Sequence, residues 1–365
     1  MNIELKNKLI VLVANEPWGD IWYSKHNYAF ELSKNNMVVF LNPAPGWKLF
    51  NALISPELKK VSETLFTLNY YNYLPLRSER LSNLNNILCS NKIKKFITSH
   101  FKRPIDIFWS FDPHRLYDPE LFSAKASVFH VVDKYDFKFI GERSLVQNSS
   151  LVVIVSKLFE KQYRDSTKNI IHVSHGIGNS QFNSDKNITT NFEGLYVGNI
   201  DERINFKLLE KILKAFPKIN FLFIGKFYSD SDPVAKSIFL DKKFPNLVWD
   251  GVKPFNDLKN YIFKAKFCLS IMDPDYPGND IAHHKTLQYL AFGKPIFGSI
   301  FKDYSDLKDL IYQSNSDEEL IELMADFLTN GENADLKEKR IGYTKQFSYD
   351  EHIQTIEKAL NELKK

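Results

Sequence analysis

The chain has 365 residues, of which 44% are hydrophobic and 14% aromatic. This length exceeds one ordinary core and predicts two domains. The formal net charge of +4 argues against nucleic-acid binding, which calls for a much more basic chain with aromatic platforms. The two cysteines, Cys89 and Cys268, make no metal-binding spacing, so we expect buried free thiols in a reducing compartment.

The charge is unevenly distributed along the chain. Residues 1–180 carry 23 basic and 16 acidic side chains, whereas residues 181–365 carry 25 and 28. A basic first half suits an anionic partner such as a membrane surface or a phosphate-bearing acceptor; a solvated basic face without a partner is the alternative. The first apolar run, residues 9–14, is too short for a signal peptide, and no run is long enough to span a membrane. We therefore expect a cytoplasmic protein, with possible attachment to the inner face of the membrane.

Strand and helix patterns alternate along the first half. Buried strands are predicted at residues 9–14, 37–41, 105–109, 127–132 and 151–155, and helices at 26–33, 82–99 and 157–165. A second series follows the polar stretch 179–191. Its strands are predicted at 193–197, 220–224, 247–249, 267–271 and 296–298, and its helices at 205–215, 256–265, 285–292 and 317–328, with a last helix at 349–364. Such alternation predicts two doubly wound α/β domains with parallel sheets.

The most informative stretch is residues 273–299. A loop rich in Pro, Gly and Asp leads into a short apolar helix that should end at Gly293, with Pro295 preventing its continuation. A loop of this kind directs backbone N–H groups and a helix N-terminus at one spot, which suits an anion.

This stretch resembles the nucleotide-sugar donor site of GT-B glycosyltransferases, in particular the family 4 or glycosyl transferases group 1 superfamily. The matching residues are Lys285, Gln288, Tyr289, Leu290, Ala291, Gly293, Pro295 and Ile296. The resemblance implies two Rossmann-like domains facing across a cleft. Residues 1–180 would form the acceptor-side domain and residues 181–345 the donor domain. Residues 346–365 would form a helix that packs back on the first domain.

The resemblance also assigns a diphosphate site in the second half. Gly198 and Gly225 each end a predicted strand, and Arg203 and Lys226 are the basic residues that follow. Lys285 is a second cation for the diphosphate. The alternative for Arg203 is a surface ion pair with an acidic neighbour, and for Lys285 a solvated side chain.

Two further donor residues follow from the spacing within the key loop. Many relatives have two acidic residues with seven between them, the first near the sugar and the second on the ribose; this chain has Asp280 and Gln288 there. Gln288 would bind the ribose through its amide, without a charge. His284 would touch the sugar, or face solvent. The stretch Pro254-Phe255 resembles the part that holds the base.

The acceptor side is expected in the first half. Asp133 follows the predicted strand 127–132, where relatives have the residue that accepts the acceptor's proton in inverting enzymes or contacts the sugar in retaining ones. The alternative for Asp133 is an N-cap of the next helix. The opening loop offers Trp18 and Trp22 for stacking on a sugar and Asp20 for its hydroxyls.

Two weaker acceptor-side candidates, Asp112 and Arg115, follow the strand predicted at 105–109. The basic segment 92–103, with interleaved aromatics, suits an interfacial membrane contact, or a helix whose apolar face packs on the sheet while its lysines are solvated.

These features predict an enzyme that transfers a hexose-type sugar from a nucleotide-diphosphate sugar to a polysaccharide or lipid-linked glycan, without cofactor or metal. The Asp-x-Asp pairs at 230–232 and 273–275 lie outside the expected nucleotide-binding context, and no Gly-x-Gly-x-x-Gly follows the first strand, which disfavours a dehydrogenase. A non-catalytic protein that binds sugar nucleotides or glycans is the alternative, because Gln288 replaces an acidic residue.

Overall fold

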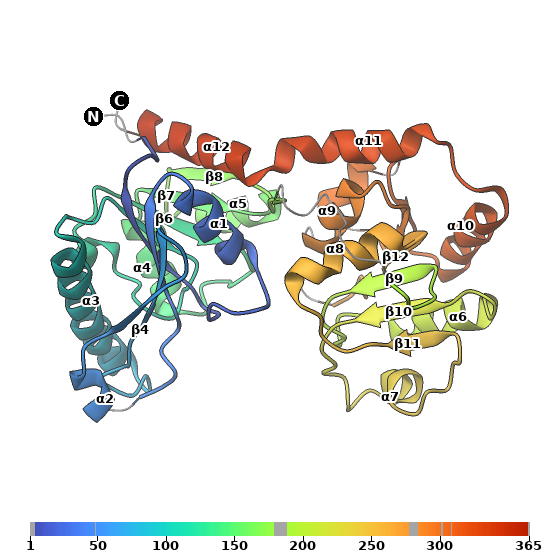
Figure 1. Ribbon diagram of the computed structural model, residues 1–365, viewed down its shortest axis with the longest axis horizontal. Helices are drawn as coiled ribbons and strands as arrows, with labels where there is room; N and C mark the ends of the chain where they lie inside the picture. The colour runs from blue at the N-terminus through green and yellow to red at the C-terminus, as the bar shows by residue number, and fades with distance from the viewer. Residues whose placement is uncertain are drawn as a thin grey trace. The chain divides into compact units, whose positions relative to one another are not determined.

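A computed structural model of the chain describes residues 4–47, 49–178, 188–276, 284–300, 302–307 and 309–363. The chain divides into two compact units (Figure 1). Unit 1 comprises Met1–Ser174 and Tyr349–Lys365, and unit 2 comprises His175–Ser348. Both are α/β structures built on a mainly parallel sheet, which confirms the predicted fold class.

In its described residues, unit 1 has an eight-stranded sheet with the strand order β3-β4-β2-β1-β5-β6-β7-β8. The strands pair in parallel except β3, which runs antiparallel to β4 at one edge. Their bounds are β1 (Leu9–Val13), β2 (Met37–Leu41), β3 (Glu57–Lys60), β4 (Leu65–Asn69), β5 (Ile107–Ser110), β6 (Ala126–Val131), β7 (Leu151–Ile154) and β8 (Ile170–His172).

The central strands of unit 1 are apolar along their whole length because helices cover both faces of a parallel sheet. Every residue of β1, β5, β6 and β7 is buried. The α-helices of this unit are α1 (Ser24–Ser33), α2 (Leu49–Leu53), α3 (Glu79–Phe101), α4 (Ile140–Asn148), α5 (Glu160–Tyr163) and α12 (Tyr349–Glu362). Two 3₁₀ helices, η1 (Pro119–Phe122) and η2 (Lys157–Phe159), complete it.

The C-terminal helix α12 belongs to unit 1 and packs against α1 and β7. The ring of Tyr349 meets that of Tyr28 edge to face at 4.9 Å. Toward the other end of α12, the Glu357 carboxylate accepts a hydrogen bond of 2.7 Å from the backbone N–H of Leu5. These contacts tie the last helix to the first strands and helix of the chain.

The described residues of unit 2 form a six-stranded parallel sheet with the order β11-β10-β9-β12-β13-β14. The strands are β9 (Gly194–Val197), β10 (Phe221–Ile224), β11 (Leu247–Trp249), β12 (Phe267–Ser270), β13 (Ile296–Gly298) and β14 (Tyr312–Gln313). The α-helices are α6 (Phe206–Ala215), α7 (Pro233–Phe239), α8 (Phe255–Lys264), α9 (His284–Ala291), α10 (Asp317–Asn330) and α11 (Asp335–Thr344). The 3₁₀ helices are η4 (Lys302–Leu307) and η5 (Lys345–Phe347).

Each sheet has a point where the strand order reverses. In unit 1 the chain leaves β1 toward β2 and later returns to β5 on the other side; in unit 2 it leaves β9 toward β10 and returns to β12. The loops after two such strands diverge, which opens a crevice at the carboxyl ends where ligands bind in open α/β sheets. The loops after β1 and β5, and after β9 and β12, are therefore where each unit should bind its ligand.

The predicted helix stop at Gly293 is confirmed. Helix α9 ends at Ala291, and Gly293 has a φ of +66°, a conformation that glycine adopts at low cost. The N–H of Gly293 donates to the carbonyl of Leu290 and that of Lys294 to the carbonyl of Tyr289, closing the helix end.

The prediction for residues 157–165 is wrong in part. One continuous helix was expected, but the structure has η2 followed by the single turn α5, with Ser156 capping η2 through its side chain. None of the helices in the described part of the chain is both long and apolar enough to cross a membrane.

Candidate functional site

Two glycines shape the carboxyl end of the unit 2 sheet. Gly198 follows β9 with a φ of +143°, and Gly225 follows β10 with a φ of +153°. A Cβ on Gly225 would lie 1.8 Å from the carbonyl oxygen of Gly198, so only glycine permits this approach of the two turns. The two turns therefore pack closely together at this end of the sheet.

Lys285 brings an ammonium group to the same place. It lies in the first turn of α9, and its Nζ donates a 2.9 Å hydrogen bond to the hydroxyl of Tyr196 on β9. Nζ also lies 4.0 Å from the centre of the Tyr196 ring and 3.7 Å from the position of a Cβ on Gly198. The structure thus brings the predicted residues Gly198 and Lys285 together, with Tyr196 beneath the ammonium.

The environment of Lys285 disfavours its charged form. Burial, with a smaller contribution from the positive charge of Arg203, lowers the pKa of Lys285 from 10.5 to about 7, although Asp201 acts in the opposite direction. In the described part of the chain no carboxylate lies within ion-pair distance of Lys285; its nearest polar partners are Tyr196 and the sulfur of Met272. An anionic ligand at this spot would relieve that cost.

Arg203 lies in the loop between β9 and α6 and makes an ion pair. Its Nε and Nη2 donate to the two oxygens of Asp201 at 2.9 and 2.7 Å. This is the ion pair with an acidic neighbour that we considered as the alternative role of Arg203. The Arg203 side chain is 40% exposed. Asn205 then caps α6 by accepting from the N–H of Leu208.

Gln288 lies one turn after Lys285 on α9 and is buried. With Phe255, Asn256 and Lys259 of α8 it lines a small pocket. The structure thus brings the residue predicted for the ribose next to the stretch predicted for the base. Both predictions concern neighbouring parts of one nucleoside, and this placement agrees with that.

The remaining donor-side residues are dispersed. Lys226 is exposed, with its ammonium 4.8 Å from the ring centre of Tyr228. The ring nitrogen Nε2 of His284 lies 2.9 Å from the carbonyl oxygen of Gly176, and burial lowers the pKa of His284, so this imidazole is anchored to backbone rather than solvent-facing. Asp280 lies outside the described residues.

In unit 1, Asp133 lies two residues beyond the end of β6 and is exposed. The N-cap alternative for this residue is wrong: the next helix, α4, begins at Ile140, and its N-cap is Phe139. Asp133 and the buried Asp112 favour the charged form of Lys25 through their negative charges, which places Asp133 near that lysine.

No sequence pattern pointed to Lys25, a lysine in the first turn of α1 whose side chain is only 3% exposed. Its ammonium donates to the side chains of Asn15 and Glu16, and burial lowers the pKa of Lys25 to about 8. A lysine on a helix is normally expected to be solvated. Only the strand order shows that α1 follows the strand at which the order of the sheet reverses.

The predicted sugar-stacking tryptophans pack on the protein itself. The Trp18 ring lies 5.3 Å from Trp22 and 5.1 Å, edge to face, from Phe40. Trp22 donates from its indole nitrogen to the carbonyl of Gly19. Both rings are half-buried, and Asp20 beside them is exposed, so the loop is a packed aromatic cluster with one edge in solvent.

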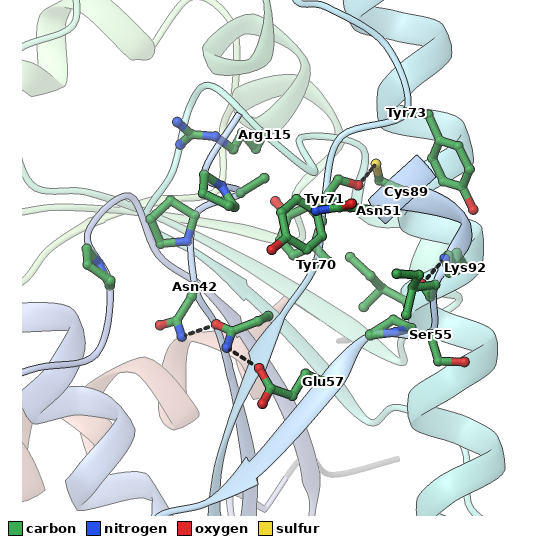
Figure 2. A pocket seen from close by; sticks show the side chains of 18 of the residues that line it. Asn42, Asn51, Ser55, Glu57, Tyr70, Tyr71, Tyr73, Cys89, Lys92 and Arg115 are labelled. Carbon is green, nitrogen blue, oxygen red and sulfur yellow. Dashed lines mark hydrogen bonds between the residues drawn. The ribbon is translucent and has the colours of Figure 1, made fainter. Parts of the chain in front are cut away.

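Unit 1 has a pocket of about 740 Å³ that was not predicted from the sequence. It lies beyond the carboxyl ends of β1, β2 and β4, and Figure 2 shows Tyr70 and Tyr71 near its middle. An amide chain forms one wall: Asn42 donates to Asn69 at 2.7 Å, and Asn69 donates to Glu57 at 3.0 Å. Amides, a carboxylate and flat aromatic rings are groups that suit the hydroxyls and faces of a sugar.

Two basic residues also line this pocket. Arg115 extends from the loop after β5 and donates from Nη1 to Asp112 at 2.8 Å. Lys92 of α3 lies on another wall and donates to the backbone carbonyl of Ile54 at 2.5 Å. Of the two weaker acceptor-side candidates, Arg115 therefore lines the pocket. Asp112 does not line it and accepts a hydrogen bond from Arg115.

Neither Asp-x-Asp pair gathers a metal site among the described residues. Asp232 caps α7 by accepting from the N–H of Ala235, and Asp273 accepts from the N–H of Asp275 within its own turn. No group of three His, Cys, Asp or Glu side chains suited to a metal occurs in the described ranges. Cys89 and Cys268 are buried free thiols, as predicted.

Comparison with solved structures identifies the fold. A UDP-forming α,α-trehalose-phosphate synthase from Burkholderia xenovorans matches at a TM-score of 0.69 and 11% identity, covering 98% of this chain and 100% of that one. Anabaena Alr3699/HepE, solved with UDP and glucose, matches at 0.69 and 13%, covering 97% and 99%. A sucrose-phosphate synthase from Thermosynechococcus elongatus matches at 0.66 and 10%, covering 98% and 99%.

These neighbours are GT-B glycosyltransferases, and the chain shares their fold along nearly its whole length. No protein-family model matches the chain, and no curated protein matches it in sequence. The predicted resemblance is therefore confirmed at the level of the fold.

Proposed function

We propose that this chain is a glycosyltransferase, which moves a hexose-type sugar from a nucleotide-diphosphate sugar onto a polysaccharide or a lipid-linked glycan. The observation that carries the proposal is the Lys285 ammonium, held on Tyr196 beside the bare backbone of Gly198 at the sheet's reversal point. The fold supports it, since the neighbours include a UDP-forming synthase and a protein solved with UDP and glucose.

The chemistry follows from the leaving group. When the bond between sugar and diphosphate breaks, negative charge grows on the diphosphate oxygens. Lys285 and the partly exposed Arg203 would meet that charge, and a cation already held in position costs little reorganisation. Two side-chain cations at the diphosphate would supply the positive charge that a metal ion supplies elsewhere, so we propose a metal-independent reaction without a cofactor.

Gln288 completes the donor site in this proposal. Its amide would bind the ribose hydroxyls while Phe255 and Asn256, in the same small pocket, contact the base. His284, anchored on Gly176, and Asp280 would contact the sugar.

The acceptor would bind in unit 1, in the pocket around Tyr70 and Tyr71. Asp133, beyond β6, would take the acceptor's proton if the configuration is inverted, or contact the sugar if it is retained. The polysaccharide or lipid-linked acceptor, the contact with an anionic membrane and the cytoplasmic location are parts of this proposal that rest on the sequence.

Donor binding tests the proposal. Thermal-shift and calorimetric titrations would use UDP-, GDP-, dTDP- and ADP-glucose with the wild type, Lys285→Ala and, as a surface control, Lys214→Ala, an exposed lysine on α6. One donor should stabilise the wild type and the control, by about 3 kcal/mol at 100-fold excess over the dissociation constant, but not Lys285→Ala. Equal stabilisation of wild type and Lys285→Ala would remove Lys285 from the site, and no stabilisation by any donor would contradict the proposed function.

A further inference from the structure

Helix α2 presents an apolar face to solvent. Phe50, Leu53 and Ile54 are 83%, 68% and 66% exposed. Phe50 and Leu53, spaced i and i+3, share one side of the helix, and Ile54 follows its last residue directly. The opposite side carries Ala52, which is buried, and Lys92 of α3 donates to the carbonyls of Ala52 and Ile54. Lys92 therefore contacts the backbone at the end of α2, while the side chains of Phe50 and Leu53 are exposed.

The first half of α3 extends this apolar surface. Leu84, Ile87 and Leu88 have an i, i+3, i+4 spacing and are also exposed. Leu88 lies one turn before Lys92, the residue that contacts α2, so the two apolar faces meet at that lysine. Figure 1 shows α2 beside α3. We call the α2–α3 surface the set made up of Phe50 and Leu53 of α2, Ile54 directly after it, and Leu84, Ile87, Leu88 and Lys92 of α3.

Basic residues flank the apolar part of the α2–α3 surface. Arg80 lies one turn before Leu84, and Lys92 and Lys95 lie one and two turns after Leu88. The only acidic residue of α3 is Glu79, at its first position. Unit 1 as a whole carries 26 basic and 20 acidic residues. Exposed apolar side chains bordered by basic residues are typical of a helix that lies in the interface of an anionic bilayer.

The α2–α3 surface adjoins the polar pocket of unit 1. Ile54 and Lys92 belong to both, and Asn51, between the exposed residues of α2, also lines the pocket (Figure 2). A molecule whose polar head occupied the pocket would therefore leave it along an apolar, basic-bordered surface. A lipid-anchored saccharide has this division into head and tail, whereas a free phosphosugar has not.

We propose that unit 1 docks on an anionic bilayer through the α2–α3 surface, and that its pocket takes the saccharide head of a lipid-anchored acceptor directly from the membrane. The docking rests on the surface alone. The identification of the bound head as an acceptor rests on the proposed glycosyltransferase function.

Sedimentation with vesicles tests the docking. Wild type, Phe50→Ser/Leu53→Ser and Phe263→Ser would be mixed with phosphatidylcholine vesicles with or without one-quarter phosphatidylglycerol. Phe263 is the matched control, because it is 60% exposed but lies on α8 in unit 2. Wild type and control should bind the anionic vesicles, more weakly without phosphatidylglycerol, and the double variant should bind at least tenfold more weakly. Wild type that stays in the supernatant, or a double variant that binds as the wild type does, would overturn the proposal.

Two further measurements separate the docking from its alternatives. Sedimentation velocity without lipid should give the same mass for wild type and double variant; a dimer that the double variant dissociates would show that the surface binds a second copy of the chain and would overturn the lipid assignment. Release of nucleoside diphosphate from the donor in vesicle-free buffer should be equal in both proteins. Vesicle binding without release of nucleoside diphosphate, either in this buffer or with vesicles that carry the acceptor, would contradict the proposed function while upholding the docking.

Discussion

Protonation of Lys285 should accompany donor binding. At pH 8 an ammonium with a pKa of about 7 is largely neutral, so only about one tenth of the free protein carries the charge there. A diphosphate beside Nζ favours the charged form. Binding at pH 8 should therefore draw about 0.9 proton per site from the buffer, if the bound pKa returns to its ordinary range.

The sign of the pH dependence follows directly. Above the pKa of the free protein, each binding event must first protonate the amine, so affinity should fall by up to about tenfold, or about 1.4 kcal/mol, for each pH unit. At pH 6 about nine tenths of the amine is already charged, so proton uptake should fall to about 0.1 per site and affinity should level off. The donor's phosphates do not titrate in this range.

Calorimetry at pH 8 in two buffers of different ionisation enthalpy measures this uptake. Lys285→Met should abolish it. Lys25→Met is the matched control, because burial also lowers the pKa of Lys25, to about 8, but this lysine lies in unit 1, and its loss should leave the uptake intact. Absence of uptake in the wild type, or its persistence in Lys285→Met, would refute the assignment of Lys285 to the diphosphate.

Three other substitutions test separate parts of the account. Asp133→Asn should lower sugar transfer by about 10²–10⁴-fold if Asp133 is the base, with donor affinity unchanged in calorimetry; wild-type transfer would remove it from the mechanism. Gly225→Ala should cost more unfolding free energy in urea than Gly198→Ala, because its Cβ meets a carbonyl oxygen at 1.8 Å whereas the other's nearest neighbour is at 3.4 Å; the reverse order would contradict the close approach of these turns. Arg340→Met should destabilise unit 2 by about 3–5 kcal/mol in urea unfolding, since the buried guanidinium holds Glu332 through two 2.7 Å hydrogen bonds; a loss below 1 kcal/mol would show the pair is dispensable.

The strands that carry the sheets could be predicted from sequence because they are buried on both faces. Met37–Leu41 and Ile296–Gly298 have the predicted bounds, as does Leu247–Trp249 although its last two residues are exposed, and the other predicted strands differ by a few residues at their ends. The edge strand Glu57–Lys60 was missed because its exposed, charged residues show no apolar period. Glu57–Lys60 forms a strand because it pairs with Leu65–Asn69 in the sheet. Contacts with that neighbouring strand, not the residue pattern within Glu57–Lys60, determine its structure.

The donor-side residues were easier to predict than the acceptor side. Gly198 and Lys285 stand in motifs whose local pattern of strand end, glycine and helix start fixes their position. The unit 1 pocket instead collects residues from loops after different strands and from α3, so no stretch of sequence signals it. Trp18 and Trp22 were assigned to a sugar, and the sequence did not predict that Trp18 also packs against Trp22 and Phe40.

Sugar transfer itself is the most direct test of the central claim. The purified chain would be incubated with the donor that binds best, and release of nucleoside diphosphate would be followed with and without anionic vesicles carrying extracted lipid-linked saccharides. The account predicts release that rises with the acceptor vesicles, falls strongly in Lys285→Met and is unchanged in Lys214→Met, an exposed lysine on α6. Donor that binds but is never cleaved under either condition would contradict the enzyme and indicate a protein that only binds sugar nucleotides.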